Sequence, residues 1–372
     1  MAFDIIDYVK WLGGFSYREL RFSDLDALVM CQLSYLNFDG VISQSFSHKT
    51  KLSEVWAKFK SLPDYEERTH LGAMINTKSV DLLQACALSK RFGSQYVCGY
   101  VSKIDLSKEE QFSCMTFYEN VLSKNPFVAF RGTDDTLVGW KEDFNLALSS
   151  HIPAQVDALD YLKDVARCSR GKIFVGGHSK GGNLAVYAGS FIDKKYRNRI
   201  KTVFNFDGPG FEDRVTQTAE YKQVLPKVHS YFPHLSIVGM LFQHPASYSV
   251  VESFGQGVMQ HDPFSWSVCA QGFVTKEDFD PASKLFEKTF NAWMKELAPE
   301  RRELFVETLF NVLEATGART NSDLEKNWFE TARKMVHAMA KIDRETSKEV
   351  VEIVKLLLKC AKRNIPDTEW FK

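Results

Sequence analysis

The stretch from Lys172 to Ala185 constrains this chain more than any other, because an apolar run stops at a glycine-rich turn and continues in residues suited to a helix. The turn reads Gly177-x-Ser179-x-Gly181. Glycines two positions on either side of a serine remove Cβ atoms that would collide in a sharp turn. A serine at such a corner exposes its hydroxyl at the positive end of the following helix. The pattern predicts a nucleophile elbow, although an ordinary strand-to-helix turn has similar glycines.

The composition argues against several functional classes. The chain has 372 residues, and its 47 basic and 47 acidic side chains give a formal net charge of zero, so charge gives no reason to expect a nucleic acid or an anionic membrane as partner. No run approaches the length of a membrane span, and the first ten residues do not resemble a signal peptide. The cysteines, seven in number, show no metal-binding spacing. We therefore expect reduced thiols, a cytoplasmic protein, and neither metal nor cofactor.

Apolar runs and helical patterns alternate between residues 95 and 265. The runs at 95–105 and 111–118 are separated by a polar turn and predict a hairpin. Further short buried strands are predicted near residues 126–130, 172–176, 201–207, 228–233 and 248–253. Because helical segments separate most of these runs, they predict an α/β fold with a mostly parallel sheet covered on both faces.

Helical patterns dominate both ends of the chain. Amphipathic segments at 23–36, 52–59 and 79–91 precede the sheet, and four more follow from Asp280, with predicted starts at Asp280, Pro299, Asn321/Ser322 and Ser347. We therefore expect an α/β domain over residues 1–279, made of a helical N-terminal part (1–92) and a core (93–279). A helical subdomain over 280–372 would follow, either as a lid over the site or as an interface between copies of the chain.

A serine nucleophile needs a base and a group that orients the base. His261 follows the last predicted strand and a glycine-rich turn, and we favour it as the base over His234 and His244. Asp207 ends a buried strand, so its carboxylate is expected at the same sheet edge as the serine. The competing interpretations are a turn aspartate that bonds its own backbone, and a site in which Ser236 orients the histidine without a carboxylate.

Oxyanion donors are expected from two backbone amides. One is the N–H of Lys180, directly after the serine, and the other is the N–H of Thr133 at the end of an early strand. Gly132 would allow the close approach that such a corner needs. Arg131 is expected to form a structural ion pair with a carboxylate such as Asp143.

These motifs resemble the class 3 (fungal-type) lipases of the α/β-hydrolase superfamily over roughly residues 120–265. The resemblance is carried by Phe127–Thr133, by Trp140 with Asp143, and by Gly177–Gly182. Over nearly its full length the chain also resembles bacterial Mbeg1-like proteins, a group named as a domain of unknown function. The segments Asp7–Trp11, Ser236–Leu241 and Gln260–Trp266 carry that second resemblance.

The resemblance implies a nucleophile at Ser179, a base at His261, and oxyanion amides at Thr133 and Lys180. One position departs from the class 3 pattern, because Ser236 stands where those lipases carry the aspartate of the triad. Pancreatic-type lipases place their acid in a turn that Phe206-Asp207-Gly208-Pro209 is similar to, which favours Asp207.

Two hypotheses follow for the function. The first is a serine esterase or lipase for a small-molecule or lipid-like ester, and amide or peptide cleavage would use the same residues. The second is a non-catalytic binding or regulatory protein that has kept the fold, and the serine at position 236 favours it.

Overall fold

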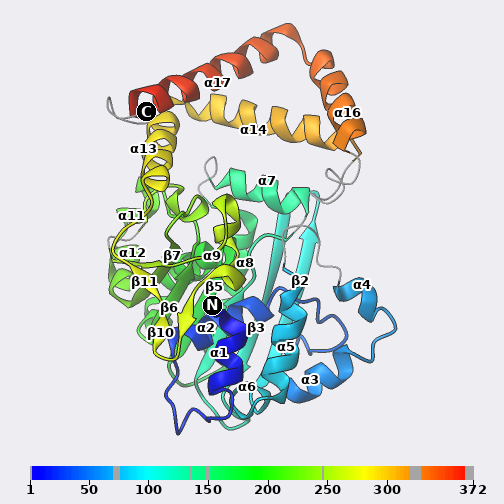
Figure 1. Cartoon of the computed structure of the whole chain (residues 1–372), viewed down its shortest axis with the longest axis vertical. Helices are drawn as coiled ribbons and strands as arrows, with labels where there is room; N and C mark the ends of the chain where they lie inside the picture. The colour runs from blue at the N-terminus through cyan, green and yellow to red at the C-terminus, as the bar shows by residue number, and fades with distance from the viewer. Residues whose placement is uncertain are drawn as a thin grey trace.

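The fold is built on one sheet of nine strands, shown in the computed structural model in Figure 1. The structure describes residues 2–69, 76–134, 136–146, 151–244, 247–317 and 328–364. In spatial order the strands are β1 (Thr50–Lys51), β2 (Tyr96–Asp105), β3 (Glu110–Tyr118), β4 (Pro126–Phe130), β5 (Ile173–His178), β6 (Ile200–Phe206), β7 (Val228–Pro233), β8 (Ser249–Val251) and β11 (Thr275–Lys276). Strands β4 to β8 pair in parallel, whereas the pairs at both edges are antiparallel. The predicted α/β fold is confirmed, and the predicted hairpin is β2 with β3.

Alternation along the central strands sends side chains to two separate cores. On β4, Phe127 and Ala129 belong to one core, whereas Val128 and Phe130 belong to the other. The register places Phe130 beside Gly177 of β5, and His178 beside Phe206 of β6. The carboxyl ends of β4, β5 and β6 therefore meet at one edge of the sheet.

Helices cover both faces of this sheet. The first core packs the N-terminal helices on one face, namely α1 (Ile5–Leu12), α2 (Asp24–Leu33), α3 (Leu52–Phe59) and α5 (Lys78–Leu88), and the short helices α4 (Tyr65–Thr69) and α6 (Lys90–Gly93) lie in the same part of the chain. The second core packs α8 (Pro153–Cys168), α9 (Lys180–Phe191) and α12 (Ala219–Val224), with α10 (Lys194–Arg197) and α11 (Asp213–Thr216) beside them in sequence. The N-terminal helices thus share a core with the sheet.

Short elements fill the remaining connections. They are the 3-10 turns η1 (Leu225–Lys227), η2 (Val238–Met240), η3 (Gly257–His261) and η4 (Pro263–Ser265), and the small pair β9 (Val268–Cys269) with β10 (Gly272–Phe273). Turn η3 ends on the predicted base, His261.

The C-terminal helices gather at one end of the molecule (Figure 1). They are α13 (Pro281–Glu296), α14 (Pro299–Glu314), α16 (Trp328–Lys341) and α17 (Arg344–Asn364). A small apolar core joins α13 to α17, and the indole of Trp293 donates to the carbonyl of Ile353 at 3.1 Å. Helix α14 packs on α7 (Leu137–Asn145), where the rings of Phe144 and Phe310 lie 5.7 Å apart.

Two predicted helix boundaries were wrong. Helix α17 begins at Arg344, because the carboxylate of Asp343 accepts the amides of Glu345 and Thr346, so Ser347 lies inside the helix and does not cap it. The helix predicted over 79–91 is divided at Ser89, whose extended backbone ends α5 and whose hydroxyl caps α6. The predicted cap at Asn321/Ser322 lies outside the described residues.

Candidate active site

Ser179 occupies a strained corner between β5 and α9. Its backbone has φ +58° and ψ −134°, a conformation that L residues rarely adopt, and its amide donates to the carbonyl of Phe206 at 2.9 Å. A Cβ on Gly177 would lie 2.1 Å from the carbonyl carbon of Gly181, so the turn has no room for larger residues there. The strand, the strained serine and the helix have the geometry of a nucleophile elbow, and the chain has the α/β-hydrolase fold.

Asp207 and His261 lie together, as the sequence predicted. Nδ1 of His261 lies 2.6 Å from Oδ2 of Asp207, whose side chain is fully buried at the end of β6. The backbone of Asp207 has a positive φ of 50°, and its amide donates to the carbonyl of Tyr231 on the neighbouring strand. The carboxylate therefore points at the histidine and does not bond its own turn.

Ser236 contacts this same carboxylate. Its hydroxyl donates to Oδ1 of Asp207 at 2.5 Å and accepts the amide of Gly239 at 3.1 Å. Both candidates for the orienting group are thus brought to one place, where Asp207 contacts the imidazole and Ser236 contacts Asp207. Ser236 is thus a second support for an aspartate that follows another strand.

The segment that carries His261 is held in place by residues for which the sequence predicted no role. The indole of Trp266, which is fully buried, donates to the carbonyl of Gln260 at 2.8 Å. The side-chain oxygen of Gln260 accepts the amide of Leu235 at 2.9 Å. These two contacts fix the residue directly before His261. Gln260 and Trp266 both belong to the segment that carries the family resemblance. Neither residue is part of a periodic helix or strand pattern, so no signal in the sequence indicated these contacts.

The predicted oxyanion corner lies against the elbow. A Cβ on Gly132 would lie 2.9 Å from the Cβ of Ser179, so the absence of a side chain allows the two turns to approach. The hydroxyl of Thr133 donates to Oδ2 of Asp143 at 2.5 Å, which fixes the side chain of the corner residue. Withdrawal from water raises the pKa of the Asp143 carboxyl to about 6.

The structural ion pair expected for Arg131 is present, but its partner is Asp134 and not Asp143. Its guanidinium lies 3.2 Å from Oδ2 of Asp134, three residues further along the same loop, and Asp143 is taken by Thr133. The spacing in the sequence did not distinguish this pair, three residues apart, from a pair with Asp143, twelve residues away.

The side chain of Lys180 is occupied by a buried ion pair with Glu142. Its ammonium lies 2.8 Å from Oε2 of Glu142 and 2.9 Å from two oxygens of Gln111, in a fully buried ion pair. Lys180 is the first residue of α9, where backbone N–H groups have no partner within the helix. The oxyanion donor predicted at Lys180 is its backbone amide, which the side chain does not contact.

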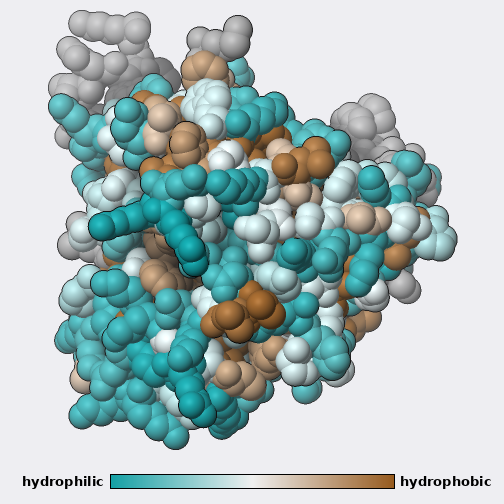
Figure 2. Space-filling model, turned by 90° about the horizontal axis from the view of Figure 1, so that it is seen from below, coloured by the Kyte–Doolittle hydropathy of each residue, from teal (hydrophilic) through white to brown (hydrophobic). Residues whose placement is uncertain are grey.

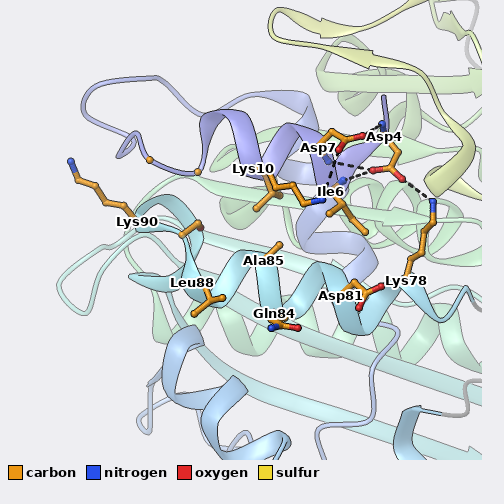
Figure 3. A pocket seen from close by; sticks show the side chains of 14 residues that line it. Asp4, Ile6, Asp7, Lys10, Lys78, Asp81, Gln84, Ala85, Leu88 and Lys90 are labelled. Carbon is orange, nitrogen blue, oxygen red and sulfur yellow. Dashed lines mark hydrogen bonds and ion pairs between the residues drawn. The ribbon is translucent and has the colours of Figure 1, made fainter. Parts of the chain in front are cut away.

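A cavity of about 780 Å³ lies elsewhere, between α1 and α5. Figure 3 shows the side chains of Asp4, Lys10, Lys78 and Asp81 around it, and none of its lining residues belongs to the site at Ser179.

The molecule seen from below is mainly hydrophilic, with a compact hydrophobic group near its centre (Figure 2). Within the described residues no cluster of histidine, cysteine and acidic side chains could hold a metal ion, and no helix could span a membrane.

The chain is similar to a protein family and to solved structures. The family model described as Mbeg1-like matches residues 86–311. A crystal structure of M37 lipase is similar at 13% sequence identity and a TM-score of 0.34, with 59% of this chain and 70% of that chain covered. No curated protein matched the chain.

Proposed function

Since this chain belongs to the Mbeg1-like family, whose name carries no activity, we propose from the site itself that it is a serine hydrolase acting on carboxylic esters. The observation that carries the proposal is the contact of 2.6 Å between Asp207 and His261 at the sheet edge where the strained Ser179 stands. A nucleophile directly after β5, an orienting carboxylate directly after β6 and a base at the end of turn η3, beyond β8, are the parts that acyl transfer requires.

In the proposed mechanism Nε2 of His261 takes the proton of the Ser179 hydroxyl as its oxygen bonds to the ester carbonyl carbon. Asp207 holds the proton on Nδ1 and stabilises the imidazolium that forms. The backbone amides of Thr133 and Lys180 stabilise the oxyanion. Collapse expels the alcohol, which takes the proton from Nε2. Water then attacks the acyl-enzyme with His261 again as base, and releases the carboxylic acid.

An apolar ester fits the surroundings of the base. Phe254, Val258 and Met259 are exposed on the segment that leads to His261, with 47%, 65% and 60% of their surfaces accessible. Phe144 on α7, the residue after Asp143, is also exposed. Exposed large apolar side chains on the segments that carry His261 and Asp143 support a lipid-like or other hydrophobic ester over a polar one.

The contact between Ser236 and Asp207 also weakens the rival hypothesis. A non-catalytic protein was favoured because position 236 lacks a carboxylate. Ser236 instead donates to a carboxylate that reaches the histidine, which supports turnover.

The proposal extends to the location of the protein and to its C-terminal helices. None of the seven cysteines forms a disulfide and five are buried, which supports a reducing, cytoplasmic compartment. Residues 280–372 would form a helical subdomain that caps the site through the contact of α14 with α7. Arg302 of α14 forms an ion pair with Glu212 at 3.0 Å. This contact within one chain supports the role of a cap rather than that of an interface between copies.

A fluorophosphonate probe tests the proposal. We expect covalent labelling of the folded protein and its loss in Ser179→Ala. Ser190→Ala is the matched control, because Ser190 lies in α9 with its hydroxyl bonded to the carbonyl of Val186. Absence of labelling in the wild-type protein, or undiminished labelling of Ser179→Ala, would sink the assignment.

A further inference from the structure

A second histidine, His178, contacts the backbone of the proposed base. Its Nε2 lies 2.8 Å from the carbonyl oxygen of His261, and the two rings lie 4.5 Å apart. The other ring nitrogen, Nδ1, lies 2.8 Å from the hydroxyl of Tyr35. Tyr35 follows α2, so the contact joins the N-terminal helices to the centre of the site.

The chemistry of these three groups allows one arrangement of protons. A backbone carbonyl can only accept, so Nε2 of His178 carries the hydrogen and donates it. Burial lowers the pKa of His178 well below its ordinary value, which keeps the ring neutral and makes Nδ1 an acceptor. Burial raises the pKa of Tyr35, so its phenol keeps its proton and donates it to Nδ1. The chain of hydrogen bonds therefore runs from Tyr35 through His178 to the carbonyl of His261.

Tyr35 also touches the opposite side of the site. A Cβ on Gly132 would lie 2.2 Å from the Tyr35 hydroxyl and 2.6 Å from the carbonyl of His178. The phenol thus fills the space beside the oxyanion corner while its hydrogen bond reaches the base. The buried side chains of His178 and Tyr35 thus contact both the turn that ends at His261 and the Gly132 corner. The distance between these two turns determines how Ser179 lies relative to its proposed base and to a substrate.

We propose that His178 and Tyr35 are positioning residues, which hold the backbone of His261 and the Gly132 corner at the spacing that acyl transfer needs. This inference rests on the proposed function for its effect on rate, whereas the positioning itself is independent of it. Neither residue takes part in proton transfer, because the contact of His178 is to a main-chain carbonyl. Small displacements of reacting groups lower rates by about 10²-fold, so the loss of this clamp is expected to reduce kcat with little change in KM.

The variants His178→Phe, His178→Gln and Tyr35→Phe test the proposal. Tyr161→Phe is the matched control, because Tyr161 is a buried tyrosine whose hydroxyl bonds Thr116 of β3 at 2.8 Å and the carbonyl of Gly99 of β2 at 2.7 Å. The first readout is the rate of fluorophosphonate labelling. We expect a fall of about 100-fold for His178→Phe, a fall of about tenfold for Tyr35→Phe, and little change for the control. Glutamine keeps an N–H donor, so His178→Gln should lose less than His178→Phe.

The second readout is amide hydrogen exchange over residues 257–262, measured whether or not the protein labels. We expect faster exchange there in His178→Phe and Tyr35→Phe and unchanged exchange in Tyr161→Phe. Unchanged exchange, or labelling of His178→Phe within about twofold of wild type, would overturn the positioning role. A wild-type protein that does not label would overturn the proposed function alone, and the exchange comparison would still decide the role of His178.

Discussion

Replacing Asp207 with asparagine tests how the base is oriented. The Ser236 hydroxyl accepts the amide of Gly239 and donates to Oδ1 of Asp207, so an oxygen is required at the Oδ1 position. The amide nitrogen of Asn would then occupy the Oδ2 position, which lies 2.6 Å from Nδ1 of His261. An N–H donor at that point forces the imidazole to keep its hydrogen on Nε2, where it cannot accept the serine proton. We expect kcat to fall by about 10⁴-fold, equivalent to about 5.4 kcal/mol.

The same geometry supplies the controls. Ser236→Ala removes one hydrogen bond to a charged group that stays in place, so we expect a loss of at most about tenfold. The double variant Asp207→Asn with Ser236→Ala frees the amide to rotate its oxygen toward His261, and we expect it to be more active than Asp207→Asn alone. The assay is kcat and KM on a chromogenic short-chain ester, with thermal unfolding to confirm folding. An Asp207→Asn variant within about tenfold of wild type, or a Ser236→Ala variant as impaired as Asp207→Asn, would refute the orientation argument.

Three further perturbations follow from the site. The pKa of Asp143 is raised to about 6, so folding favours its protonated form. Its contribution to the free energy of unfolding is complete below about pH 4 and is lost as the pH rises through 6, by up to about 3 kcal/mol. Urea unfolding of Asp143→Asn at pH 4 and pH 8 should lack this change. Lys180→Met should lower the free energy of unfolding by about 3–5 kcal/mol by leaving Glu142 buried and unpaired, and adding Glu142→Gln should restore part of it; equal stability of the single and double variants would contradict this. Gly132→Ala should slow labelling strongly because its Cβ would lie 2.2 Å from the Tyr35 hydroxyl, and an unchanged rate would show that the corner can move.

Local patterns predicted the parts of the site that are local. The elbow was found because strand, turn and helix follow one another within Lys172–Ala185, and Asp207 and His261 were found because each follows an apolar run that ends at the sheet edge. The proposed roles of these residues remain predictions.

Contacts between distant segments were not predictable in this way. The bond from Ser236 to Asp207 joins residues 29 positions apart, and the bond from Tyr35 to His178 joins residues 143 positions apart. Neither contact follows a sequence period. Short-range alternatives also misled the prediction, because Arg131 found Asp134 in its own loop and Asp343 formed the cap that was assigned to Ser347.

The shared core of the N-terminal helices and the sheet determines where the chain can be cut. The family match begins at residue 86, after α1, α2 and most of α5. A fragment that starts there keeps the elbow and the base but uncovers one face of the sheet, including Phe127 and Phe204. An uncovered apolar face on parallel strands promotes aggregation. We therefore expect that residues 86–311 do not fold independently, and that a fragment needs the first 85 residues to cover this face of the sheet.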